Sequence, residues 1–385
     1  MRILHTSDWH LGRLFHRVHL TEDQAHVLDQ LIEVARAERP DVIVVAGDLY
    51  DRAVPPPQAV ELLDEVFTRL TSELSIPTIA IAGNHDSAER VGFGARLLGQ
   101  RRLHIAGTVG QARSVTLDDA HGSVDFVLVP YAAPEVVRAI CGDERVRGHE
   151  AALRSQLEAL GPAPSGRRRV AIAHAFVEGA RTCDSERPLT VGGAGTVAAS
   201  VFEGFDYVAL GHLHRPQDVA TPGAKARIRY SGSLLPYSFS EVGYDKSVSL
   251  VELDAAGVSR VQEIPLSPRR KVRVMQGRFE ELLAGPPSED YLLVRLDDRE
   301  PILDAMARLR ARFPNVLVVE RTKLGPSGHD AREELQDPRR IDTLELFEQF
   351  YRTVVAAEDD AERELDEADR TLVAEAVAAA REASV

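Results

Sequence analysis

Short apolar runs rich in β-branched residues recur along roughly the first 265 residues, and each of them ends at a turn. Helical stretches separate several of the early runs. Strands that alternate with helices predict an α/β domain. The runs from residue 125 onward have little helix between them, so part of the sheet material is expected to be antiparallel. The predicted strands are 2–5, 42–46, 78–82, 125–129, 170–173, 207–210 and 247–252.

The pattern changes after a proline-containing stretch at 264–270, which predicts a domain boundary. Residues 291–296 and 316–320 read as strands, and apolar residues between 302 and 313 have helical spacing. A small strand–helix–strand unit is therefore expected up to about residue 337. Asp342 and Glu345 resemble a capping box at the start of a helical tail. The predicted regions are 1–268, 269–337 and 338–385.

Composition narrows the class of protein. The 385 residues suffice for two or three domains with buried cores, and two cysteines exclude a disulfide scaffold or a cysteine-based zinc module. Every apolar run ends well before the ~18 residues of a membrane span, and residues 1–8 read as a strand, not a signal peptide. We therefore expect a cytoplasmic protein without membrane contact.

The net charge of −14 argues against a protein that coats nucleic acid by bulk charge. The charge is uneven, because residues 340–385 carry 13 acidic and 5 basic residues. The remaining chain is therefore only mildly acidic, and a partner that supplies basic surface would allow work on DNA.

Polar residues with metal-binding side chains follow the apolar runs at five places. Strand ends in α/β sheets line a common crevice, so these side chains are expected to converge. A glycine precedes the polar group in three of the five segments, where it allows a tight turn. The segments are Asp8-Trp9-His10, Gly47-Asp48, Gly83-Asn84-His85-Asp86, His174 and Gly211-His212-Leu213-His214.

These residue types suit two divalent ions. Carboxylate, imidazole and amide ligands fit Mn²⁺, Fe²⁺ or Zn²⁺. The two oxygens of Asp48 can bridge ions about 3.5–4 Å apart, a pair that activates water and stabilises both oxygens of an in-line displacement at phosphorus. The pattern thus favours phosphoester hydrolysis.

The order of the five segments resembles the calcineurin-like metallophosphoesterases. Within them, the segments 4–13, 45–51, 209–215 and 230–241 are similar to those of the SbcD nuclease subunits. The resemblance covers nearly the whole chain, more strongly up to about residue 270. It implies two β-sheets sandwiched between helices, a small α/β capping domain and a helical tail.

The resemblance also implies a role for each site residue. His85 would contact the phosphate and protonate the leaving oxygen, and the metals would be two Mn²⁺ ions. One ion would be held by Asp8, His10, Asp48 and His214, and the other by Asp48, Asn84, His174 and His212.

The implied activity is Mn²⁺-dependent hydrolysis of DNA by two-metal activation of water. It comprises a double-strand 3′–5′ exonuclease and a single-strand or hairpin endonuclease, acting on DNA ends. The tail would bind the coiled-coil base of an SbcC-like ATPase. A homodimer is expected, and with the ATPase a heterotetramer; the helical stretches 58–71 and 91–98 are candidates for the dimer contact.

Several alternatives stay open at this point. A generic phosphoesterase acting on a nucleotide or phosphoprotein would share every metal ligand, and a non-enzymatic subunit could clamp DNA for its partner. Arg13 and His16, beside the first motif, are candidate DNA contacts. Asp86 could orient His85 or close a turn, and Trp9 is expected to pack beneath the site.

Overall fold

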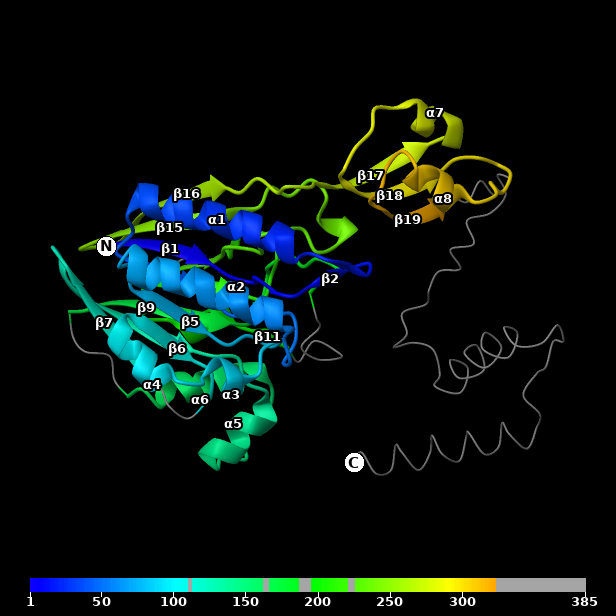
Figure 1. Cartoon of the computed structure of the whole chain (residues 1–385). Coiled ribbons are helices and arrows are strands. Elements are labelled where there is room, and N and C mark those ends of the chain that lie inside the picture. Colours follow the sequence, from blue (N-terminus) through cyan, green and yellow to red (C-terminus); the bar gives the residue numbers. More distant parts are fainter. Residues whose placement is uncertain (110–112, 162–165, 187–194, 221–225, 323–385) are drawn as a thin grey trace, which may run out of the picture. The chain divides into compact units, whose positions relative to one another are not determined.

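Two six-stranded sheets form the main body of the computed structural model, which describes residues 1–109, 113–161, 166–186, 195–220 and 226–322 (Figure 1). The first sheet has the order β16-β15-β1-β4-β5-β6. Its four neighbouring parallel strands are β1 (Arg2–Thr6), β4 (Val42–Val45), β5 (Thr78–Ile81) and β6 (Leu103–Ala106), and the antiparallel pair β15 (Ser247–Asp254) and β16 (Gly257–Pro265) continues beside β1.

The second sheet has the order β13-β14-β12-β9-β8-β7. Its central strands run parallel, and only its two edge strands are antiparallel to their neighbours. The strands are β7 (Arg113–Asp119), β8 (Gly122–Val129), β9 (Arg168–His174), β12 (Tyr207–Gly211), β13 (Gln217–Asp218) and β14 (Arg227–Tyr230).

Helices cover the outer face of each sheet. Successive side chains along a strand point to opposite faces, so strands that are apolar throughout need cover on both sides. On β4, Val42 and Val44 pack into the core between the two sheets, whereas Ile43 and Val45 face the helices of the first sheet. Those helices are α1 (Thr21–Glu38), α2 (Pro57–Thr68), α3 (Ala88–Val91) and α4 (Ala95–Leu98), and the second sheet packs against α6 (His149–Glu158), which contacts α5 (Pro134–Cys141).

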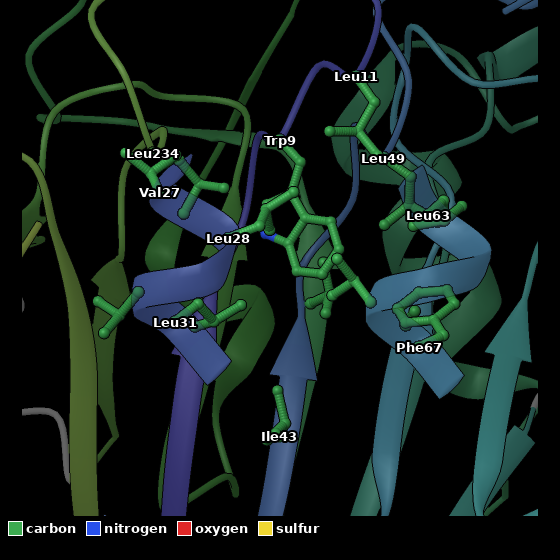
Figure 2. Close-up of a cluster of buried hydrophobic side chains, with 14 of the residues drawn as sticks. Trp9, Leu11, Val27, Leu28, Leu31, Ile43, Leu49, Leu63, Phe67 and Leu234 are labelled. Atoms are coloured by element: carbon green, nitrogen blue, oxygen red, sulfur yellow. The ribbon is translucent and has the colours of Figure 1, made fainter. Parts of the chain in front are cut away.

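Trp9 lies at the centre of the core between the first sheet and its helices (Figure 2). Its side chain is fully buried, and Figure 2 shows it between residues of α1 and α2. The indole Nε1 donates to Thr6 Oγ1 at 3.0 Å, so the one polar atom of the ring is satisfied. Trp9 therefore packs beneath the site, as expected, and offers no surface for stacking on a base.

A smaller unit follows the boundary stretch. Three parallel strands, β17 (Val272–Gly277), β18 (Tyr291–Leu296) and β19 (Val316–Arg321), pack with α7 (Phe279–Ala284) and α8 (Ala305–Arg310) around their own apolar core. The unit is tied to α1 through Asp23, which accepts hydrogen bonds from Tyr291 Oη at 2.8 Å and from Arg270 Nη1 at 3.0 Å.

The predicted strands are all present. The sequence pattern did not predict helices α5, α6 and α7 or strands β6, β7, β13, β14, β16 and β17. The strands at 125–129, 170–173 and 207–210 are parallel to one another, so the antiparallel part lies at 247–252 and at the sheet edges. The stretch 91–98, expected to be one helix, holds only the last residue of α3 and the whole of α4. Short strands β2 (Leu14–Phe15), β3 (Val18–His19), β10 (Phe176–Val177) and β11 (Thr196–Val197) pair near the site loops.

The expected helical tail lies outside the described residues. Within the part of the chain that the structure describes, no helix is long and apolar enough to traverse a lipid bilayer.

Candidate metal centre

The five segments converge where the strands of both sheets end. Asp8, Asp48 and Asn84 follow β1, β4 and β5 of the first sheet, whereas His174 ends β9 and His212 follows β12 of the second. Because the two sheets pack face to face, their strand ends meet in one buried crevice. His10 Nε2 lies 3.0 Å from His214 Nε2, across 204 residues of sequence.

The backbone at these strand ends is unusual. Positive φ angles, which residues other than glycine adopt only at some cost in energy, occur at Asp8, His10, Asp48 and His212. Glycine is required next to them. A Cβ on Gly83 would lie 2.2 Å from Asp48 Oδ1, and one on Gly47, at φ +90°, would lie 2.4 Å from His174 Nδ1.

One cluster of donor atoms comprises Asp8, His10 and His214, whose side-chain atoms lie within 4.8 Å of one another. All three residues are buried. Asp8 Oδ2 accepts a hydrogen bond from Ser7 Oγ at 2.5 Å, and Asp8 Oδ1 accepts from the His212 amide at 2.9 Å. These bonds hold the carboxylate in place.

A second cluster consists of Asp8, Asp48 and His174. It adjoins the first cluster, and Asp8 belongs to both. His174 Nε2 lies 3.4 Å from Asp48 Oδ2 and 2.9 Å from Asn84 Oδ1. His212 Nδ1 reaches the same amide oxygen of Asn84 at 3.1 Å. Asp48 also lies 3.6 Å from His10 Nε2, so its carboxylate faces both clusters.

Burial controls the protonation of these groups. It lowers the pKa of His10, His212 and His214, and that of His212 reaches about 3, so these imidazoles are neutral at pH 7. Burial opposes the charge of His174, but Asp48 outweighs it and raises the His174 pKa to about 9. Burial raises the pKa of Asp8 to about 7, and the negative charge of Asp48 acts in the same direction.

The donor set fits divalent cations. His174 Nδ1 donates to the Ala46 carbonyl oxygen at 2.9 Å, which directs Nε2 at the oxygens of Asp48 and Asn84. These acceptor atoms face one another and require a proton or a cation between them. Among the described residues, His10 Nδ1 is a buried nitrogen without a hydrogen-bond partner. Oxygen and imidazole donors of this kind suit Mn²⁺, Fe²⁺ and Zn²⁺.

His85 lies beside the first cluster, with its ring centroid 4.7 Å from that of His10. Its Nδ1 donates to the Asp51 carbonyl oxygen at 2.8 Å, and its amide donates to Asp48 Oδ1 at 2.9 Å. His85 is thus positioned by the loop after β4. Asp51 itself, with His10 and His85, forms a third group of candidate metal-binding atoms that the sequence pattern did not single out.

Asp86 joins the two loops that carry Asp48 and Asn84. Its carboxylate accepts from the amides of Leu49 at 3.1 Å, Tyr50 at 2.9 Å and Gly83 at 2.8 Å. Of the two roles considered, loop closure is the one these contacts support. Burial raises the pKa of Asp86 to about 7, so its charge is costly, and the three amides offset that cost.

We expect Asp86→Ala to lower the free energy of unfolding of the metal-free chain by about 3 kcal/mol, because buried amides lose their acceptor. Chemical denaturation measures this loss. Glu89→Ala removes an exposed carboxylate three residues away and should change stability by less than about 0.5 kcal/mol. Equal stabilities of the two variants would contradict the assignment.

The two candidate DNA contacts lie at the rim of this site. Arg13 Nη1 donates to Asp51 Oδ1 at 2.8 Å, and its guanidinium lies over the Tyr237 ring at 5.4 Å. His16 is exposed and packs against Phe15 and Phe239. Arg13 is therefore held close to the clusters, whereas His16 faces solvent.

Comparisons with known proteins agree with this geometry. A family model described as calcineurin-like phosphoesterase matches residues 1–216, and one described as the type 5 capsule protein repressor C-terminal domain matches residues 268–355. The SbcD component of the nuclease SbcCD from Staphylococcus saprophyticus is 35% identical over 362 residues, which cover 92% of this chain and 93% of that protein.

Solved structures also match, at low identity. A Thermus thermophilus protein aligns with a TM-score of 0.43 and 16% identity, over 69% of this chain and 99% of its own. A dimetal phosphatase from Danio rerio aligns with a TM-score of 0.40 and 15% identity, over 70% and 99%. The family model and the relative that matches nearly end to end decide the assignment: this chain belongs to the calcineurin-like phosphoesterases and, among them, to the SbcD family of metal-dependent nuclease subunits.

Proposed function

We propose that the chain hydrolyses phosphodiesters at DNA ends and hairpins with two Mn²⁺ ions, as the nuclease subunit of a complex with an SbcC-like ATPase. The observation that carries this proposal is the pair of adjoining buried clusters that have Asp8 in common, with the Asp48 carboxylate facing both and His85 beside them. Both a double-strand 3′–5′ exonuclease and a single-strand endonuclease activity are included.

In this proposal Asp8, His10, Asp48 and His214 hold one ion. Asp48, Asn84, His174 and His212 hold the other, and the position of Asp48 between the clusters supports its bridging role. When bound, the ions would activate water and neutralise charge on the phosphate. The neutral state of His10, His212 and His214 is the state that ligation requires.

His85 acts as the general acid in this scheme. Its Nδ1–H is committed to the Asp51 carbonyl oxygen, so Nε2 is the nitrogen left to carry a proton to the departing sugar oxygen. Arg13, held by Asp51 at the rim, would contact a DNA phosphate, and exposed His16 would meet the strand farther out.

The domain assignment is part of the proposal. Residues 1–268 would be the nuclease domain, 269–337 the capping domain, and 338–385 the tail that binds the coiled-coil base of the ATPase. The small three-stranded unit with its own core supports the second domain. The tail lies outside the described residues, and its apolar stripe with acidic flanks supports a helical partner.

We further propose a homodimer that pairs through α2, α3 and α4. Phe93 and Leu97 are 85% and 72% exposed, far more than is usual for large apolar side chains. They lie near a groove of about 520 Å³ lined by Leu63, Phe67 and Leu98, among others. A second copy of the chain would bury both residues.

The double variant Phe93→Asp/Leu97→Asp is therefore expected to be a monomer of 42.2 kDa in light scattering, whereas the unaltered chain should have twice that mass. Leu303→Asp is the control. Leu303 is 83% exposed in the smaller three-stranded unit, away from α2, α3 and α4 in the sequence, so this change should leave the mass of two chains unaltered. A double variant that keeps the mass of two chains would exclude this contact.

The activity is tested by incubating the metal-stripped chain with end-labelled hairpin DNA, with and without Mn²⁺. Mn²⁺-dependent nicking or shortening is expected. If the chain hydrolyses bis-p-nitrophenyl phosphate but does not cleave DNA, even after the ATPase partner is added, it is a phosphoesterase that acts on a substrate other than DNA. Bound Mn²⁺ without hydrolysis of either compound would indicate a non-enzymatic subunit.

A further inference from the structure

Behind His214 lies a buried chain of hydrogen bonds that the proposed mechanism does not use. His214 Nδ1 lies 2.7 Å from Ser185 Oγ, which in turn donates to Glu241 Oε1 at 2.6 Å. Ser185 belongs to the loop after β10, and Glu241 ends the short 3₁₀ turn Phe239–Glu241. His214 and Glu241 are buried and Ser185 between them is partly buried, so both ends of this chain of bonds are shielded from water.

The direction of each bond follows from the chemistry of the groups. An ionised carboxylate only accepts hydrogen bonds, so the single hydroxyl hydrogen of Ser185 must go to Glu241. Ser185 Oγ then has only lone pairs to offer, and His214 Nδ1 must carry the hydrogen. A neutral imidazole has one N–H, so His214 Nε2 is the nitrogen with the free lone pair, directed at His10 Nε2.

The charge of Glu241 is secured by Lys246. Lys246 Nζ donates to Glu241 Oε2 at 2.5 Å, to the His214 carbonyl oxygen at 2.8 Å and to Ser233 Oγ at 2.9 Å. This buried ion pair places a positive charge directly on the carboxylate, which favours its ionised form. Glu241 thus stays ionised, and its acceptor role is permanent.

Ser185 is needed because Glu241 does not reach the histidine itself. Glu241 Oε1 lies 3.7 Å from His214 Nδ1, beyond hydrogen-bond distance. The other cluster needs no such side chain, because the Ala46 carbonyl oxygen accepts from His174 Nδ1. A change at Ser185 should therefore affect one of the two clusters and not the other.

We propose that Ser185 is a positioning residue that links Glu241 to His214 and so fixes His214 Nε2 as a metal-binding nitrogen of the Asp8–His10–His214 cluster. This inference rests on the proposed function, in which His214 holds one of two ions. Ser185 itself touches neither ion nor substrate. Removing a hydrogen-bond partner of this kind typically weakens metal binding 10- to 100-fold.

The test is a Mn²⁺ titration of the metal-stripped full chain, followed by calorimetry and by the EPR signal of free Mn²⁺. For Ser185→Ala we expect one of the two ions to bind about 10- to 100-fold more weakly and the other to bind unchanged. Ser185→Thr keeps the hydroxyl and should restore the affinity. Ser240→Ala is the control, because Ser240 is exposed, bonds the Asp184 amide of the same loop, and does not contact His214.

The number of ions affected, read together with thermal unfolding of the metal-free variants, separates positioning from a general structural role. Ser185→Ala is expected to melt a few degrees lower, because His214 Nδ1 and Glu241 Oε1 each lose a partner, and the inference requires that its loss of affinity be confined to one ion. It is overturned if Ser185→Ala binds both ions with unaltered affinity, or if it weakens both ions equally. Failure of the unaltered chain to bind two ions would instead refute the proposed function on which the inference rests.

Discussion

Replacement of His85 by asparagine is expected to slow Mn²⁺-dependent DNA hydrolysis about 100- to 10,000-fold while both ions stay bound. The asparagine amide nitrogen takes the place of His85 Nδ1 and can still donate to the Asp51 carbonyl oxygen. The loop is thereby preserved, and only the proton carried by Nε2 is lost. Single-turnover cleavage of labelled DNA measures the rate, and calorimetry measures the ions.

A substrate with an acidic leaving group makes this test more specific. A p-nitrophenyl ester of thymidine 5′-phosphate releases an anion that needs no proton, so His85→Asn should lose much less activity on it than on DNA. His121→Asn, in the exposed turn between β7 and β8, is the control and should keep full activity on both. Equal losses on the two substrates, or loss of an ion, would assign His85 a role other than general acid.

Asp48→Asn should have the largest effect of all, with loss of high-affinity binding of both ions and a decrease in DNA hydrolysis of at least about 1,000-fold. Asp48 faces His10 Nε2 at 3.6 Å and His174 Nε2 at 3.4 Å, so one neutral amide would replace the charge that both clusters use. Asparagine keeps an oxygen that can accept from the His85 amide, so the fold should be preserved.

Thermal unfolding with and without Mn²⁺ gives a second measurement of the same change. An ion at 100 times its dissociation constant stabilises the folded state by about 2.7 kcal/mol. The unaltered chain should therefore melt higher when Mn²⁺ is added, and Asp48→Asn should not. Asp64→Asn, on the exposed side of α2, should behave like the unaltered chain. A full Mn²⁺ shift in Asp48→Asn would contradict the bridging role.

The sequence was most informative where chemistry and strand ends coincide. Apolar β-branched runs followed by Asp, Asn or His predicted both the central strands and the convergence of eight side chains from Asp8 to His214. The crevice results from parallel strands that end on one side, which the alternation of strands and helices already indicates.

Residues in irregular loops could not be found in this way. Asp51 acts through its backbone oxygen on His85, and a backbone contact leaves no mark in residue type. Ser185 and Glu241 lie 56 residues apart, and neither follows a predicted strand. The helices α5 and α6 have only 8 and 10 residues, too few for a sustained helical periodicity, so the spacing between 125–129 and 170–173 suggested no crossover.

The crevice between the sheets also has a consequence for folding. Its candidate metal-binding residues follow strands of the first sheet up to Asn84 and strands of the second from His174 onward. A nascent or partly folded chain that holds only one layer therefore lacks three or four of the seven candidate metal-binding residues. Contacts across some 200 residues form late, since long loops must close first. In the proposed scheme, ion binding would therefore come last, and only a completely folded chain could be active.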